Sequence, residues 1–329
     1  MKLIKIKDAC GQVLCHDMTQ IIPGQSKTTA FRKGHVIQQE DIPALLGMGR
    51  ENIYVWEKPE GMLHEEEGAE RLRDLCRGAN LRAEPAREGK VELFAERAGV
   101  FKVNSEKIIR LNSIGGIAVV TKKGNRGIGE GEKLAALKIV PLLIEKEKLD
   151  RAAEICGSEK IFNVLPYTRK KAGLIISGSE LYHKRKPDTG SAILRAKLEA
   201  FPAECAETAI LPDDDGQITA KILAMIEGGM DLIICTGGMS VDPDDRTPLA
   251  IKNSGARIVS YGVPLMPGTM LLLAYFEKGG ARIPVIGAPA CVFHDQRTAL
   301  DMFLPRLMAS DPISREEIAL LGEGGLDLS

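Results

Sequence analysis

The sequence predicts an α/β fold whose C-terminal part is a doubly wound, mostly parallel sheet. An apolar strand at 171–176 runs into Ser177-Gly178-Ser179-Glu180, and a second at 231–235 runs into Thr236-Gly237-Gly238. The carboxyl ends of parallel strands meet at one edge of a sheet, where ligands bind in open α/β folds. Because both loops contain glycines, we expect them to meet at that edge and to approach an anion with backbone N–H groups.

Helices and strands alternate through the rest of this region. Apolar residues recur at helical spacing, for example Leu194, Leu198 and Phe201 on one face and Ile218, Ile222 and Met225 on another. The pattern predicts helices at 188–201, 217–227 and 293–308. It predicts further strands at 205–211, 257–262, 270–276 and 283–286. Strands that alternate with helices favour a sheet covered on both faces.

The first half of the chain is less regular. At 329 residues the chain exceeds the usual size of a single core. We expect a small β-rich domain at 1–60, a middle α/β domain at 61–168, the parallel-sheet domain at 169–309 and a C-terminal tail at 310–329. Within the first two, the sequence predicts strands at 1–7 and 53–56, a turn at Pro23-Gly24, and helices at 41–49 and 65–80.

Composition excludes two classes of partner. The net charge is −1, without the basic excess of a nucleic-acid-binding protein. No apolar run approaches the roughly 20 residues that a membrane helix needs, and residues 1–7 alternate charged and apolar side chains, unlike a secretory signal. We therefore expect a cytoplasmic protein that binds neither nucleic acid nor membranes.

Three other patterns are compatible with ligand binding, but each has a simpler interpretation. The seven cysteines lack a Cys-x-x-Cys pair and resemble buried small hydrophobic residues, so a metal at Cys10, Cys15 and His16 is the less favoured interpretation. The acidic run 65–67 is expected to be a solvated first turn of a helix, favoured by the helix dipole. The glycine-rich stretch 124–131 lacks the ending of a phosphate loop, which favours a plain loop.

Four ordered motifs within residues 170–308 carry a specific resemblance. They are Ser-Gly-Ser-Glu-Leu after a strand, Asp188-Thr189 before a helix, Leu-Pro-Asp-Asp before the next, and Thr-Gly-Gly-Met-Ser-Val with Asp245 downstream. In this order they resemble the molybdopterin-binding (MoaB/Mog-like) domain of molybdopterin molybdenumtransferases of the MoeA and gephyrin type and of Mog-type adenylyltransferases. Pro267-Gly268 and Gly287-Ala288-Pro289 follow at the matching places.

The resemblance implies a cytoplasmic protein of molybdenum cofactor biosynthesis that binds adenylylated molybdopterin and takes molybdate as a second substrate. It implies Mg²⁺ at Glu180, Asp188 and Asp245, which would be the catalytic residues. It also implies a homo-oligomer and contacts with other molybdenum cofactor enzymes. The implied ligand-binding residues are Ser177, Gly178, Ser179, Thr236, Gly237, Gly238, Met239, Ser240, Asp242, Thr247, Pro267, Gly268, Thr269 and Pro289.

The sequence is compatible with two functions, a molybdenumtransferase and a non-catalytic pterin-binding protein. The chain has Thr269 where the family shows the lysine of Pro-Gly-Lys-Pro, and Ala290 where it shows the asparagine of Pro-Gly-Asn-Pro. These departures favour a non-catalytic carrier or sensor of the pterin, whereas the three acids favour a transferase. The acids also have a structural alternative, since Asp188 and Asp213 are well placed to cap helices.

Overall fold

The computed structural model describes residues 2–22, 26–55, 59–168, 170–240, 242 and 245–326. The chain divides into two compact units, one formed mainly by residues before 165 and the other mainly by those after it. The predicted turn at Pro23-Gly24 lies outside the described residues. Within them, no helix is both long enough and apolar enough to cross a membrane.

The first unit begins with small elements around their own core. Ile6, Leu14, Leu45 and Ile53 are buried together. The same segment contains two antiparallel strand pairs, β1-β4 and β2-β3. The elements are β1 (Lys2–Lys5), β2 (Met18–Ile22), β3 (Ser26–Phe31), α1 (Asp41–Gly47) and β4 (Asn52–Val55).

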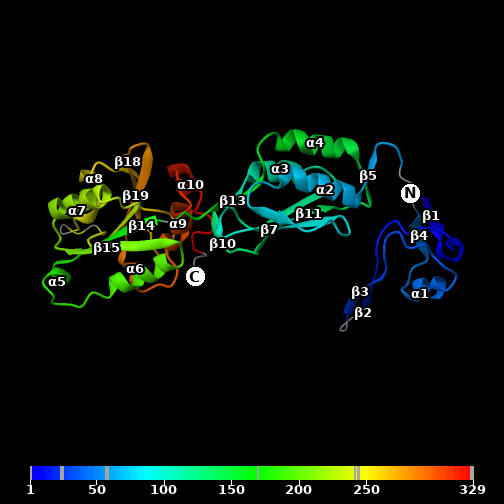
Figure 1. The fold of residues 1–329 in the computed structure, drawn as a ribbon, viewed down its shortest axis with the longest axis horizontal. Helices are drawn as coiled ribbons and strands as arrows, with labels where there is room; N and C mark the ends of the chain where they lie inside the picture. Colours follow the sequence, from blue (N-terminus) through cyan, green and yellow to red (C-terminus); the bar gives the residue numbers. More distant parts are fainter. Residues whose placement is uncertain are drawn as a thin grey trace. The chain divides into compact units, whose positions relative to one another are not determined.

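The rest of this unit is a four-stranded antiparallel sheet, in the order β6-β7-β11-β9, with α2, α3 and α4 along one face (Figure 1). β5 pairs with β12. The strands β10, β8 and β13 form a separate sheet, in which β10 and residues 99–101 of β8 are grouped with the second unit. The elements are β5 (Met62–His64), α2 (Glu65–Cys76), β6 (Leu81–Ala83), β7 (Lys90–Ala95), β8 (Gly99–Val103), α3 (Ser105–Asn112), β9 (Ile117–Thr121), β10 (Arg126–Ile128), β11 (Lys133–Ile139), β12 (Leu143–Glu145), α4 (Lys146–Cys156) and β13 (Phe162–Pro166). The glycine-rich stretch 124–131 thus contains a short strand.

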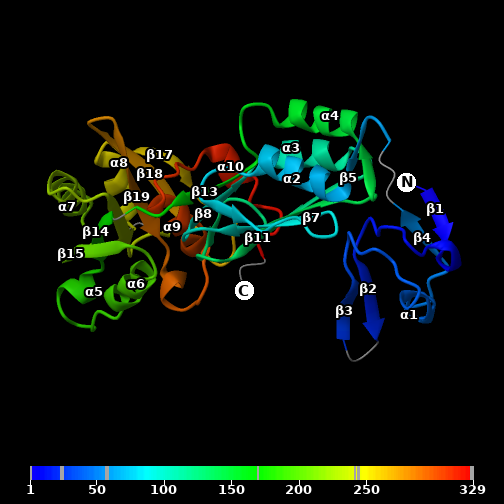
Figure 2. The same cartoon turned by 45° about the vertical axis from the view of Figure 1, so that its right-hand side comes forward.

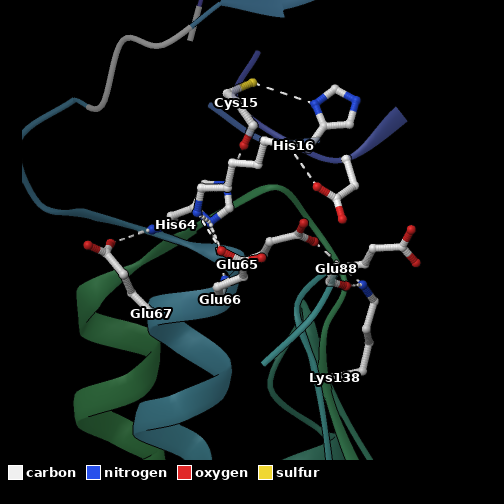
Figure 3. Close-up of polar contacts among 10 residues, drawn as sticks. Cys15, His16, His64, Glu65, Glu66, Glu67, Glu88 and Lys138 are labelled. Atoms are coloured by element: carbon white, nitrogen blue, oxygen red, sulfur yellow. Dashed lines mark hydrogen bonds and ion pairs between the residues drawn. The ribbon is translucent and has the colours of Figure 1, made fainter. Parts of the chain in front are cut away.

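The first turn of α2 differs from the expected solvated run (Figure 3). Glu65 is 7% exposed and lies 3.5 Å from Lys138 Nζ, and burial raises the pKa of its carboxyl. Glu66 pairs with Lys33, and Glu67 accepts a hydrogen bond from the backbone N–H of His64. The prediction of a solvated turn was wrong for Glu65, because the helix start packs against neighbouring segments.

The second unit confirms the predicted doubly wound sheet. Its order is β15-β14-β16-β19-β18-β17. The strands β15, β14, β16 and β19 run parallel to one another, β18 runs antiparallel to β19, and β17 runs antiparallel to β18. The strands are β14 (Lys170–Ser177), β15 (Ala203–Leu211), β16 (Leu232–Thr236), β17 (Arg257–Tyr261), β18 (Leu272–Lys278) and β19 (Ala281–Ala288).

Helices cover both faces of this sheet (Figure 2). Each face has its own hydrophobic core. Leu194, Leu300 and Phe303 contribute to one core, and Ile218, Ile222 and Ile251 to the other. The helices are α5 (Ser179–Tyr182), α6 (Gly190–Glu199), α7 (Asp215–Glu227), α8 (Thr247–Asn253), α9 (Ala299–Met308) and α10 (Arg315–Ala319).

The last predicted helix begins later than expected. Its helical pattern suggested a start at 293, but α9 starts at Ala299, after a short 3₁₀ turn at Ala290–Phe293. The Asp301 carboxylate accepts from the N–H and the hydroxyl of Thr298, and the Asp301 N–H donates to the Thr298 carbonyl. This cap fixes the helix start, and it leaves the preceding residues as a loop at the carboxyl edge of the sheet.

Candidate functional site

The two loops expected to meet at the sheet edge do meet. β14 and β16 are parallel neighbours, so the loops that follow them leave the sheet side by side. The Ser177 hydroxyl lies 3.1 Å from the Thr247 hydroxyl, which in turn donates to the Gly237 carbonyl at 2.7 Å. Ser177 and Thr247 are both buried. This chain of hydroxyls joins the loop after β14 to both ends of the loop after β16.

The loop after β16 turns sharply because its two glycines have positive φ, +89° at Gly237 and +54° at Gly238. Thr247 fixes the carbonyls of both: its hydroxyl bonds that of Gly237, and its N–H bonds that of Gly238 at 3.3 Å. Further along, the Asp242 N–H donates to the Asp245 carboxylate at 3.0 Å. Hydrogen bonds between residues of the loop itself therefore hold both its beginning and its end in place.

A hollow of about 220 Å³ lies over this loop. It contains a glycine loop, two acids and a proline that follows β19, the next parallel strand. Its lining residues are Gly237, Gly238, Met239, Ser240, Asp242, Asp245, Met270, Pro289 and Ala290. Seven of the residues that the resemblance implies are therefore brought together here.

The backbone amides of this loop are available to a ligand. Among the residues that the structure describes, Gly238, Met239 and Ser240 donate their N–H groups to no protein acceptor. Successive free N–H groups in a turn with left-handed residues form a concave anion-binding surface. An amide cradle, which we define as the N–H groups of these three residues, therefore fits an anion such as phosphate.

Other implied residues support the hollow without lining it. The Thr236 hydroxyl is buried and donates to the Ala288 carbonyl at 2.9 Å. Ser179 donates its N–H and its hydroxyl to Asp213. Pro267, Gly268 and Thr269 lie in the turn before β18, where the Thr269 hydroxyl donates to the Leu265 carbonyl.

Asp213 and Asp188 have different local roles. Asp213 was expected to cap a helix, but Asp214 caps α7 by accepting from Gln217, while Asp213 binds Ser179. That prediction was wrong by one residue. Asp188 accepts from the Ser191 N–H at 3.0 Å and also from its hydroxyl, so it holds the first turn of α6.

The three acids implied to bind Mg²⁺ do not form a ready ligand set. Glu180 lies on α5 and Asp188 before α6, and only Asp245 lines the hollow. Across the described ranges, three or more acidic, histidine or cysteine side chains nowhere gather in a way that could hold a metal ion. Near the N-terminus, the buried Cys15 donates its thiol to the Tyr54 carbonyl, and Cys10 is exposed.

A larger hollow, of about 520 Å³, lies in the first unit. Its rim carries opposite charges, including Arg32, Arg87, Glu84 and Glu88, and most of these side chains are exposed. The smaller hollow is the better candidate, because its donors are fixed by the backbone.

Two segments of the chain match known families. Residues 3–57 match a family described as "Domain of unknown function (DUF8806)", and residues 173–309 match one described as "Probable molybdopterin binding domain".

Curated proteins and solved structures resemble the same C-terminal region. A molybdopterin molybdenumtransferase from Synechococcus elongatus is 26% identical over 143 residues, which cover 41% of this chain and 36% of that protein. A CinA-like protein from Mycobacterium tuberculosis is 32% identical over 77 residues, 23% of this chain and 18% of that protein. The matches thus span about a third or less of these curated relatives.

Two solved structures are similar over nearly their whole length. The molybdopterin biosynthesis enzyme MoaB from Thermus thermophilus is 21% identical, with a TM-score of 0.34, and the match covers 44% of this chain and 98% of that one. A MogA structure is 18% identical, with a TM-score of 0.33, covering 46% and 100%.

Proposed function

We propose that the amide cradle binds the phosphate of a molybdopterin-type pterin, because residues 173–309, which contain it, match the family described as "Probable molybdopterin binding domain". The single observation that carries the proposal is the set of free N–H groups at Gly238, Met239 and Ser240. Each can donate to a phosphate oxygen without first breaking a bond within the protein.

The size and charge of the region support this assignment. A hollow of 220 Å³ is below the roughly 300–1,000 Å³ of a complete small-molecule pocket. It suits the phosphate-bearing end, with the pterin rings outside it. The exposed residues 183–186, His-Lys-Arg-Lys, follow the neighbouring loop and would attract a dianion over a longer range.

The finer function, Mg²⁺-dependent insertion of molybdate into adenylylated molybdopterin, has weaker support in the side chains. Both oxygens of Asp188 accept bonds from Ser191, and Asp245 is bonded to Asp242. Because these acids do not fit a common metal ion as placed, we derive no insertion step through Mg²⁺. A non-catalytic pterin carrier or sensor is the function that the geometry favours.

Calorimetric titration of the purified protein with molybdopterin, with and without Mg²⁺, tests the proposal. Binding that weakens strongly when the phosphate is removed from the ligand is the expected result. An equal affinity for the dephosphorylated pterin would contradict the cradle, and a lack of binding to either ligand would contradict the function.

A second assay separates the carrier from the transferase. The protein is incubated with adenylylated molybdopterin, molybdate and Mg²⁺, and active cofactor is measured by reconstitution of a cofactor-free molybdenum enzyme. Retention of the pterin without new active cofactor supports a carrier, whereas turnover establishes the transferase. Sedimentation equilibrium of the same sample tests the implied homo-oligomer.

A further inference from the structure

Tyr261 contacts the glycine loop from outside the hollow. It is the last residue of β17, and its hydroxyl lies 3.1 Å from the Met239 carbonyl oxygen and 3.2 Å from that of Ser240. A phenol has one proton to donate, so the two carbonyls share it. The ring is 43% exposed, so the contact adds little to the buried core.

Together, Thr247 and Tyr261 engage four successive carbonyls of this loop. Thr247 bonds those of Gly237 and Gly238, and Tyr261 bonds those of Met239 and Ser240. In a planar trans peptide the C=O and the following N–H point in opposite directions. Holding the Met239 carbonyl against Tyr261 therefore directs the Ser240 N–H of the same peptide away from Tyr261.

We propose that Tyr261 is a positioning residue, whose hydroxyl holds the Met239–Ser240 peptide so that the Ser240 N–H faces the phosphate of the bound ligand. The proposal rests on the proposed function, because it assigns a role within the same cradle. Tyr261 does not line the hollow that would hold the phosphate, so its hydroxyl would act on the phosphate through the loop.

The surroundings of Tyr261 keep its hydroxyl in the donor form. Burial and the charge of Asp245 raise the pKa of Tyr261 above its ordinary value of about 10. The phenol therefore keeps its proton at neutral pH. A phenolate would instead repel both the carbonyl oxygens and an incoming phosphate.

The test is Tyr261→Phe, which keeps the ring and removes the donor. Affinities for molybdopterin and for its dephosphorylated form are measured by calorimetry. We expect the affinity for the phosphorylated ligand to fall about 5- to 10-fold, the effect of one hydrogen bond, and that for the dephosphorylated ligand to stay unchanged. Tyr54→Phe is the matched control, since Tyr54 is 44% exposed and lies in the first unit.

A second readout follows the backbone directly. In ¹H–¹⁵N spectra, titration with the phosphorylated pterin should shift the Ser240 amide of the wild-type protein and of Tyr54→Phe. In Tyr261→Phe this shift should be much smaller, with the other loop amides less affected.

Three outcomes would overturn the role of Tyr261. Unchanged affinity for the phosphorylated ligand would show that the loop holds its shape without the phenol. An equal loss for both ligands would indicate general damage to the loop. Failure of the wild-type protein to bind either pterin would contradict the proposed function itself, and the role of Tyr261 with it.

Discussion

A β-carbon placed on Gly237 would lie 2.0 Å from the carbonyl oxygen of Ser177. That distance is far inside van der Waals contact, and the obstacle is backbone that belongs to the neighbouring strand. The position thus requires glycine for two reasons, because its φ of +89° also disfavours any side chain.

Gly237→Ala should therefore destabilise the second unit by at least about 3 kcal/mol, the scale of a severe single substitution. Gly238→Ala is the control: its φ is +54°, but the nearest atom to an added β-carbon is 3.3 Å away, so the cost should be about 1–2 kcal/mol. Urea unfolding of both variants gives the two free energies. If both variants lose a similar free energy of unfolding, the loop after β16 can move away from Ser177 at little cost, and the close contact at Gly237 is not what requires glycine.

Thr247→Val should loosen the cradle while preserving the shape of the side chain. The substitution removes the donor to the Gly237 carbonyl and one of two partners of the buried Ser177 hydroxyl, whose other partner is the Thr236 carbonyl at 3.4 Å. Leaving buried polar groups unpaired costs about 1–3 kcal/mol each. We expect a lower melting temperature together with weaker binding of the phosphorylated pterin.

Thr247→Ser is the control for that change, because it restores the hydroxyl but not the methyl group. It should recover most of the ligand affinity. If the Thr247→Val and Thr247→Ser variants bind the pterin equally well, the hydrogen-bonded hydroxyls do not determine the shape of the loop.

Asp245→Asn separates a metal ligand from a loop residue. An amide oxygen can still accept the bond from the Asp242 N–H, but the negative charge on which a hard cation depends is lost. If Asp245 holds Mg²⁺, pterin binding without Mg²⁺ should persist and any insertion activity should fall by about 10²-fold. If it only closes the loop, the hydrogen bond to the neutral amide should be weaker than that to the carboxylate, so the melting temperature should fall while the Mg²⁺ response remains.

Asp214→Asn provides a reference for that comparison, since Asp214 caps α7 away from the hollow. It should lower stability slightly without changing ligand or metal dependence. An Asp245→Asn variant that keeps full insertion activity would exclude a catalytic role for Asp245.

His64 should make the stability of the first unit depend on pH. Its Nε2 lies 2.8 Å from the Cys15 carbonyl oxygen, its Nδ1 accepts from the Glu66 N–H, and its side chain is 1% exposed. Burial, together with the charge of Lys33, lowers its pKa from the usual 6.5. The pKa of His64 is therefore lower in the folded protein than in the unfolded chain, where it is about 6.5. Below pH 6.5 the unfolded chain takes up a proton that the folded protein does not, so the free energy of unfolding is full above about pH 6.5 and decreases as the pH falls.

His64→Gln tests this directly, because glutamine can donate to the same carbonyl without titrating. Between pH 7.5 and 5.5 the wild-type protein should lose on the order of 1 kcal/mol more than the variant. The pKa of His16 is also lowered by burial, so His16→Gln is measured in parallel. The pKa of Glu65 is raised in the folded protein, so its titration increases the free energy of unfolding as the pH falls, which is opposite to the effect of His64 and occurs at lower pH. Equal pH slopes for wild type and His64→Gln would contradict the assignment.

The parallel sheet and the glycine loop could be predicted because their signals are local. Apolar runs such as residues 231–235 end directly in the glycines, and the topology of a parallel sheet then places the loop at the carboxyl edge. Side-chain partners were less predictable. From the sequence, either Asp213 or Asp214 could cap the helix that follows. The backbone conformation before α7 places Asp214 against the Gln217 N–H and Asp213 against Ser179.

Tyr261 could not have been found by local pattern. It reaches the loop because the edge strand β17 runs antiparallel to β18 and ends near Met239, which lies 22 residues earlier in the chain. The ion pair of the buried Glu65 is similar, since its partner Lys138 is 73 residues away in the chain. Long-range pairs of this kind depend on the tertiary fold, which residue spacing alone does not specify.

The chain of hydroxyls at Ser177 and Thr247 has a thermodynamic consequence. The donors and their supports come from segments that are up to 70 residues apart, so they exist together only in the folded chain. A synthetic peptide with the loop sequence alone should not bind the pterin. Any ligand of the cradle must bind the native state in preference to the unfolded one, and at 100 times its dissociation constant it would raise the free energy of unfolding by about 2.7 kcal/mol. Thermal denaturation can therefore rank candidate ligands without a catalytic assay.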